Sequence, residues 1–171
     1  MTRTWMSMDK PDIPKDDDWR HRFVALDALD KIDPLWAGLL RVWDSKRHGA
    51  LLPPWSAFDM LDFKPWLGFI AVNKVTYAPL NTHTVLWGTG LTELYGEDRT
   101  GKTLLDSQVE WCVTLKDLDF WDRVINEPCI GMTEGNLYWK GRNHVHLSRV
   151  FLPFGEDGRT CDTIASATRR I

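Results

Sequence analysis

Residues 82–103 read THTVLWGTGLTELYGEDRTGKT and contain the sharpest local signals in the chain. The first part, Thr82 to Thr89, is rich in β-branched and aromatic residues and predicts a β-strand. Gly96 and Gly101 then interrupt the pattern, so short pieces rather than one long helix are expected between residues 90 and 106.

The segment from Gly96 to Thr103 also satisfies the phosphate-loop pattern G-x-x-x-x-G-K-[ST]. A phosphate loop needs a buried strand directly before it and a long helix directly after it. Here residues 91–95 read LTELY, which resembles a helical turn, and Glu97 and Asp98 would repel the phosphates. We therefore interpret the match as accidental.

On either side of residues 82–103, the sequence predicts four further strands. The segment from residue 66 to residue 75 is apolar, lies between two prolines and should pair with the strand at 82–89. Later strands are expected at 130–139, 144–154 and 160–168, joined by glycine-containing turns.

Helices are expected on the N-terminal side of these strands and between the second and third. Residues 19–32 have apolar residues at three-residue steps, and Asp33-Pro34 is a typical start signal for a helix at 35–46. A third helix around Leu118, Trp121 and Ile125 should end before Pro128. The resulting class is α+β, with a mostly antiparallel five-stranded sheet and helices on one side.

Length, charge and cysteine content limit the classes of protein to which the chain can belong. The 171 residues suit one domain, organised as a flexible arm (1–18), N-terminal helices and a connector (19–65) and a sheet-forming part (66–171). A net charge of −3 with scattered basic residues argues against nucleic-acid binding. No apolar run has the length of a signal peptide or membrane span, and three unpaired cysteines suit a reducing compartment, so a cytoplasmic protein is expected.

Catalytic and metal signals are weak. His144 and His146 share one face of an expected strand, but a third ligand is not evident, so no metal site is predicted. No nucleophile motif occurs. An enzyme on a cone-shaped α+β fold would have to use Asp162 or His146, and neither has an evident partner. The sequence favours a protein that is not an enzyme.

Several strings together resemble a family of bacterial standalone PAS-domain proteins. They are Leu86 to Gly90, Leu94 to Gly96 and Thr100 to Lys102, preceded by Leu52-Pro53 and Phe58 to Asp62, and followed by Phe151 to Phe154 with Gly158. The similarity covers most of residues 35–168. It implies a PAS-like sheet with crossover helices and an N-terminal helical extension, in which the first strand lies between the second and the last.

The resemblance implies a sensory or adaptor module in signal transduction, without an output domain in the chain. It would bind a small molecule, a protein partner or both, and would dimerise through its N-terminal helix. The residues expected to line a cavity are Trp87, Thr89, Tyr95, Trp111, Trp121, Tyr138, Arg149 and Phe151. For each of these aromatic residues, packing in a filled core is the more common role.

The ligand or cofactor is not implied, and two familiar ones are disfavoured. Cys112 lies in EWCV (110–113), which does not match the reactive-cysteine motif of a flavin photosensor, and residues 118–126 contain no histidine for haem. A third interpretation is a dimeric interaction protein with a filled core. Its interface would be the face of the helix at 35–46 that carries Trp36, Leu39, Leu40 and Trp43.

Overall fold

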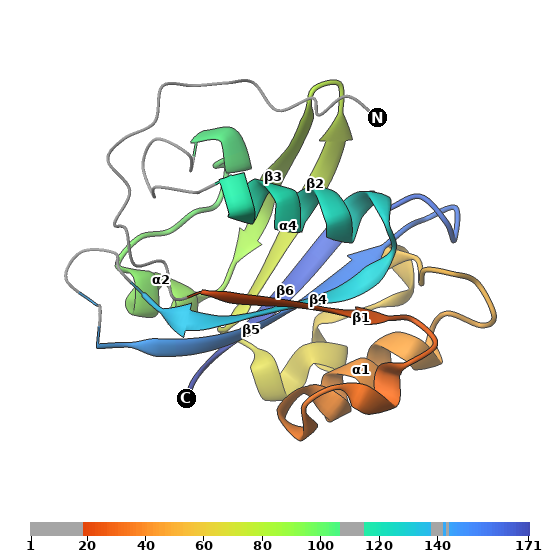
Figure 1. The fold of residues 1–171 in the computed structure, drawn as a ribbon, viewed down its shortest axis with the longest axis horizontal. Coiled ribbons are helices and arrows are strands. Elements are labelled where there is room, and N and C mark those ends of the chain that lie inside the picture. Colours follow the sequence, from red (N-terminus) through yellow and green to blue (C-terminus); the bar gives the residue numbers. More distant parts are fainter. Residues whose placement is uncertain (1–18, 107–114, 138–141, 143) are drawn as a thin grey trace.

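The computed structural model describes residues 19–106, 115–137, 142 and 144–171 (Figure 1). Its strands are β1 Arg20–Ala25, β2 Ile70–Tyr77, β3 Leu80–Trp87, β4 Cys129–Asn136, β5 His146–Phe154 and β6 Thr163–Arg170. Its α-helices are α1 Ala37–Ser45, α2 Thr89–Tyr95 and α4 Leu115–Asn126. Its 3-10 helices are η1 Leu29–Lys31, η2 Pro34–Trp36, η3 Trp55–Ala57 and η4 Met60–Trp66.

All six strands form one antiparallel sheet in the order β1-β4-β5-β6-β2-β3. Strand β2, the first strand of the 66–171 segment, lies between β3 and the last strand, β6. This is the arrangement that the PAS resemblance implies. The five strands expected from the sequence are all present, with ends shifted by a few residues.

Strand β1 corrects the prediction of a helix over residues 19–32. Residues 20–25 instead pair with β4, from Arg20 opposite Glu134 to Ala25 opposite Cys129, and make the sheet six-stranded. Local helix propensity is weak, and hydrogen bonding to a sheet edge overrides it here. The N-terminal segment therefore belongs to the same sheet as residues 66–171.

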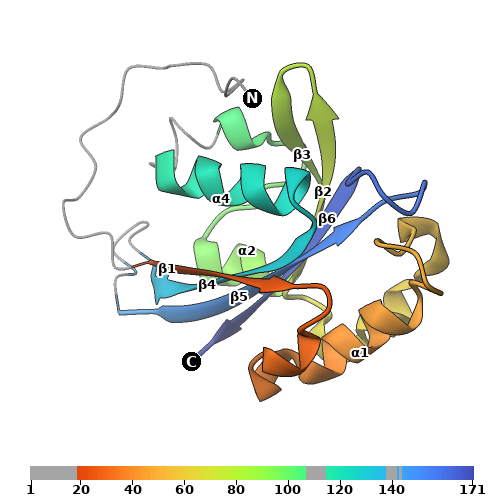
Figure 2. The same cartoon turned by 45° about the vertical axis from the view of Figure 1, so that its right-hand side comes forward.

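Helices lie on both faces of the sheet, not on one side as expected. Figure 1 shows α1 on one face and α2 and α4 on the other, and Figure 2 shows the same two layers. Strand residues alternate between the faces. On β5, Ser148 accepts a hydrogen bond from Trp36 beside α1, whereas Phe151 packs edge-on against Phe120 of α4.

The helix start at Asp33-Pro34 is confirmed. The Asp33 side chain accepts the Leu35 N–H at 2.8 Å, and η2 leads directly into α1. Asp59 and Asp62 likewise form a reciprocal capping box at the start of η4. These aspartates act on the backbone, as their positions in the sequence predict.

The phosphate-loop pattern follows a helix, α2, and not a strand. Gly96 ends α2 in the left-handed conformation, with a φ of 76°. Asp98 accepts hydrogen bonds from Thr100, which lower the pKa of its carboxyl, so an anionic group occupies the loop. The loop therefore lacks the context of a phosphate site.

Within the described residues, no helix is both long enough and apolar enough to cross a membrane.

Candidate functional site

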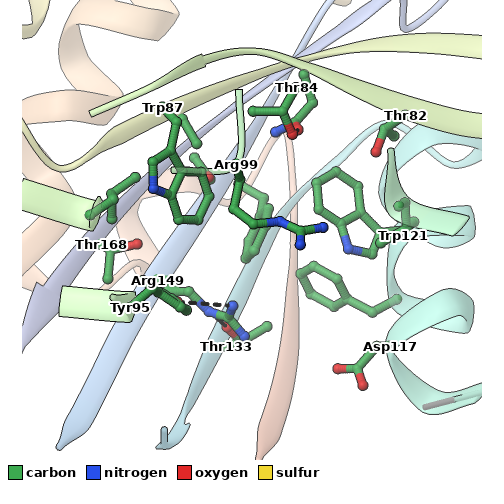
Figure 3. A pocket seen from close by; sticks show the side chains of 17 residues that line it. Thr82, Thr84, Trp87, Tyr95, Arg99, Asp117, Trp121, Thr133, Arg149 and Thr168 are labelled. Atoms are coloured by element: carbon green, nitrogen blue, oxygen red, sulfur yellow. Dashed lines mark hydrogen bonds between the residues drawn. The ribbon is translucent and has the colours of Figure 1, made fainter. Parts of the chain in front are cut away.

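A cavity of about 130 Å³ lies between the sheet and the helices α2 and α4 (Figure 3). Five strands, both helices and the turn after α2 contribute side chains to its wall. The lining residues are Ala71, Asn73, Thr82, Thr84, Trp87, Leu91, Tyr95, Arg99, Leu104, Asp117, Phe120, Trp121, Thr133, Arg149, Phe151, Ser166 and Thr168.

The cavity exists because the sheet presents small side chains to it. Ala71, Thr133, Ser166 and Thr168 are all buried and face the space, from the strands β2, β4 and β6. Native cores normally fill such positions with large apolar side chains. Short hydroxyl-bearing residues instead leave volume and add buried polar groups, which need hydrogen-bond partners. This wall suits a bound molecule with polar atoms.

Arg149 is held in a defined orientation on the wall. Its Nε donates to Thr133 Oγ1 at 2.9 Å, and its Nη1 donates to Tyr95 Oη at 3.4 Å. The centre of its guanidinium group lies 4.1 Å from the Trp19 ring and 5.6 Å from the Phe151 ring. Ring faces stabilise a cation in this position.

Arg99 and Asp117 are the other charged residues of the lining. Arg99 is 3% exposed and lies 3.6 Å from a carboxylate oxygen of Glu97. Asp117 on α4 lies 3.5 Å from Nε2 of His21 on β1. Two cations and one carboxylate therefore surround the cavity.

The volume of the cavity is large enough for one small molecule. A water molecule takes up about 30 Å³ of the liquid, and an engineered cavity of about 150 Å³ binds benzene. A space of about 130 Å³ can thus hold a few waters or one compact organic molecule.

The structure brings five of the eight predicted cavity residues together. Trp87, Tyr95, Trp121, Arg149 and Phe151 line the same space. Thr89, which was also expected to line the cavity, is instead exposed at the first turn of α2 and is not among the lining residues. Trp111 and Tyr138 lie outside the described residues.

The predicted interface on α1 is also corrected. Trp36, Leu39 and Trp43 have no exposed surface, and Leu40 is 3% exposed. The helix turns this face toward the sheet, where Trp36 Nε1 donates to Ser148 Oγ at 3.1 Å. Within one chain these four residues form core, because their apolar stripe covers the sheet face opposite the cavity.

Several lining residues were not anticipated from the sequence. Strand alternation and cross-strand pairing could have found Thr133, which lies directly opposite Arg149 in the β4–β5 pair. Arg99 lies inside the accidental phosphate-loop pattern, and no local signal of the sequence places it or Asp117 at a cavity.

None of the histidines and cysteines that the structure describes is among the residues that line the cavity. His146 contacts Asn136 and Glu134, and His144 is exposed. No cluster of three metal-ligating side chains occurs among the described residues. Cys129 and Cys161 are buried. Cys112, the cysteine that was compared with the reactive-cysteine motif of flavin photosensors, lies outside the described residues.

Comparison with known proteins gives a distant result. No family model and no curated protein sequence matches the chain. A solved structure described as an RNA-binding light-oxygen-voltage receptor is similar, with a TM-score of 0.48 and 12% identity. The match covers 88% of this chain, which spans 38% of that chain. RNA binding is a property of that protein.

Proposed function

We propose that this chain is a PAS-like sensory module that binds a small molecule in the cavity beneath α2 and α4. The observation that carries the proposal is the cavity itself, a space with buried hydroxyls and a fixed arginine where a filled core would have large apolar residues. The strand order, with β2 between β3 and β6, supports the PAS-like interpretation.

The proposal includes a non-catalytic role. His146 and Asp162 are the residues that the enzyme alternative requires, and neither lines the cavity. Asp162 accepts hydrogen bonds from the Glu156 backbone N–H and the Thr163 hydroxyl, which is a turn-stabilising arrangement. The strand order, with β2 between β3 and β6, is the one that the PAS resemblance implies, and it supports this part of the proposal.

Signal output through a protein partner and homodimer formation remain part of the proposal. Exposed apolar side chains supply surface for such contacts, since Leu61 is 74% exposed and Phe69 is 41% exposed. We also retain the predictions of no nucleic-acid binding and a cytoplasmic location. A gel-shift assay with single-stranded RNA tests the first, because the similar receptor binds RNA.

Native mass spectrometry of the purified full chain, compared with its denatured mass, tests ligand binding. We expect a non-covalent adduct of small-molecule mass. Ser166→Leu places a larger side chain in the cavity and should abolish the adduct, whereas Thr76→Leu, on the exposed end of β2, should retain it. A bare wild-type protein at dimer mass would instead favour the interaction protein.

A further inference from the structure

Arg149 differs from the other charged groups of the cavity in its partners. Arg99 lies beside the Glu97 carboxylate, and Asp117 lies beside His21. The hydrogen bonds of Arg149 go to neutral hydroxyls, those of Thr133 and Tyr95. Among the residues that the structure describes, no carboxylate forms an ion pair with Arg149.

The guanidinium group of Arg149, which lines the cavity, keeps donors that no described residue engages. Arginine has five N–H donors, and the two hydrogen bonds use Nε and one donor of Nη1. Within the described part of the chain, no acceptor bonds to Nη2. Figure 3 shows Arg149 beside Tyr95 and Thr133, and Arg99 with its guanidinium group directed toward Trp121.

This geometry costs free energy unless an anion completes it. A half-buried cation loses part of its hydration, and hydroxyl partners compensate less than a carboxylate does. The orientation is also fixed in advance by Thr133 and by the Trp19 ring. A planar guanidinium held this way matches the two oxygens of a carboxylate.

We infer that the ligand of this cavity is a small organic acid whose carboxylate binds Arg149. The inference rests on the proposed function. The body of the acid lies against the aromatic side chains of Trp87, Trp121 and Phe151, which line the same space. A volume of about 130 Å³ limits that body to roughly one six-membered ring or a short alkyl chain.

The test compares acids with their amides, which have nearly the same shape but no charge. The ligand-free full chain is titrated with benzoate and benzamide, and with butyrate and butyramide, and binding is followed by saturation-transfer NMR. An amide NH2 cannot accept hydrogen bonds from arginine. We expect at least one acid to bind about tenfold or more tightly than its amide.

Three variants assign the effect to the residue. Arg149→Gln should weaken acid binding about tenfold or more and leave amide binding unchanged. Arg149→Lys keeps the charge without the planar fork and should recover part of the affinity. Arg169→Gln, at the exposed end of β6, is the matched control and should bind as wild type does. Circular dichroism checks that each variant is folded.

The outcomes separate this inference from the proposed function. Equal binding of acids and amides, or unchanged acid binding in a folded Arg149→Gln variant, overturns the organic-acid assignment and leaves a neutral ligand. Failure of every acid to bind at millimolar concentration also overturns it. A co-purified adduct in the native mass spectrum would keep the proposed function in that case, and the absence of any adduct would remove both.

Discussion

The indole N–H groups of Trp36 and Trp43 attach α1 and its preceding turn to the sheet. Trp36 Nε1 donates to Ser148 Oγ at 3.1 Å, and Trp43 Nε1 donates to the Pro153 carbonyl at 3.0 Å. Both acceptors belong to β5. Pro153 has no backbone N–H to donate, but its buried carbonyl oxygen still needs a hydrogen-bond donor, and the Trp43 indole provides it. Two aromatic rings thus supply apolar burial and a directed hydrogen bond at the same time.

Trp43→Phe should therefore destabilise the protein by about 2–4 kcal/mol, because the Pro153 carbonyl loses its donor and a cavity remains. Urea denaturation followed by circular dichroism measures the change. Leu61→Ala is the control, since Leu61 is 74% exposed, and should change stability by about 0.5 kcal/mol or less. A Trp43→Phe variant as stable as wild type would contradict the assignment of this residue to the core.

Two buried thiols make stability depend on alkaline pH. Burial raises the pKa of Cys129 to about 11 and that of Cys161 to about 12, from an ordinary value of 9.0. The folded state therefore retains these protons at pH values where the unfolded chain loses them. Stability should fall as the pH rises above 9.0, until it passes the folded pKa values.

Cys161→Ala should reduce this loss of stability, because it removes the thiol with the larger shift. Urea midpoints of wild type and variant are compared at about pH 8 and about pH 10. Cys129→Ala should reduce the loss by nearly the same amount, because both folded pKa values, about 11 and about 12, lie above the higher pH of the comparison. The same pH slope in wild type and Cys161→Ala would show that the thiol is not protected in the folded protein.

At the scale of elements, the corner between β3 and α2 depends on close backbone contact. A Cβ at Gly88 would lie 2.2 Å from the Gly68 carbonyl oxygen, which is far inside van der Waals contact. Gly88 N–H also donates to the Ile70 carbonyl at 2.9 Å. This contact sets where α2 begins, and so where Trp87 and Tyr95 meet the cavity.

Gly88→Ala should destabilise the protein by about 1–3 kcal/mol, because the backbone at Gly68 has to move. Gly38→Ala in α1 is the matched control. Its Cβ would lie 3.5 Å from Trp66, an ordinary contact, and alanine is the better helix former. Thermal denaturation should show a lower Tm for Gly88→Ala and a higher one for Gly38→Ala. A similar loss in both would point to general sensitivity to glycine replacement.

At the scale of the whole molecule, residues 19–48 are part of the fold and not an appendage. Strand β1 completes one edge of the sheet through β4, and α1 covers the face opposite the cavity. Seven of the buried core residues come from this segment, namely Val24, Leu26, Ile32, Trp36, Leu39, Leu40 and Trp43.

Removal of residues 1–48 should therefore abolish cooperative unfolding, since it uncovers the apolar face of the sheet. Differential scanning calorimetry of the 49–171 fragment measures this. The intact chain should show one cooperative transition. A fragment that unfolds cooperatively, near the temperature of the intact chain, would mean that the N-terminal segment is dispensable and free for an interface.

Much of the fold was accessible from local pattern. Strands β2 to β6 were predicted because β-branched runs between turn residues have few other solutions. The cap at Asp33 was predicted because capping depends on residues that are neighbours along the chain. In the site, Trp87, Tyr95, Trp121, Arg149 and Phe151 were named in advance through the family resemblance and their residue types.

The features that the local sequence pattern could not predict depend on contacts between residues that are distant in sequence. Residues 20–25 form a strand only because β4, more than a hundred residues later, offers hydrogen bonds to them. Trp36 and Trp43 are core because β5 accepts their N–H groups, although the same apolar stripe on a separate helix would suit a dimer.

The α+β class, the five later strands, the helix start at Asp33 and the arginine at position 149 of a strand follow from the amino-acid sequence alone. The three-dimensional arrangement is needed to show that Arg149 lines a cavity, that its hydrogen-bond partners are hydroxyls and that Arg99 lines the same cavity. The physical reason is that secondary structure follows from neighbours along the chain. A cavity and the pairing of its charges arise where segments distant in sequence meet.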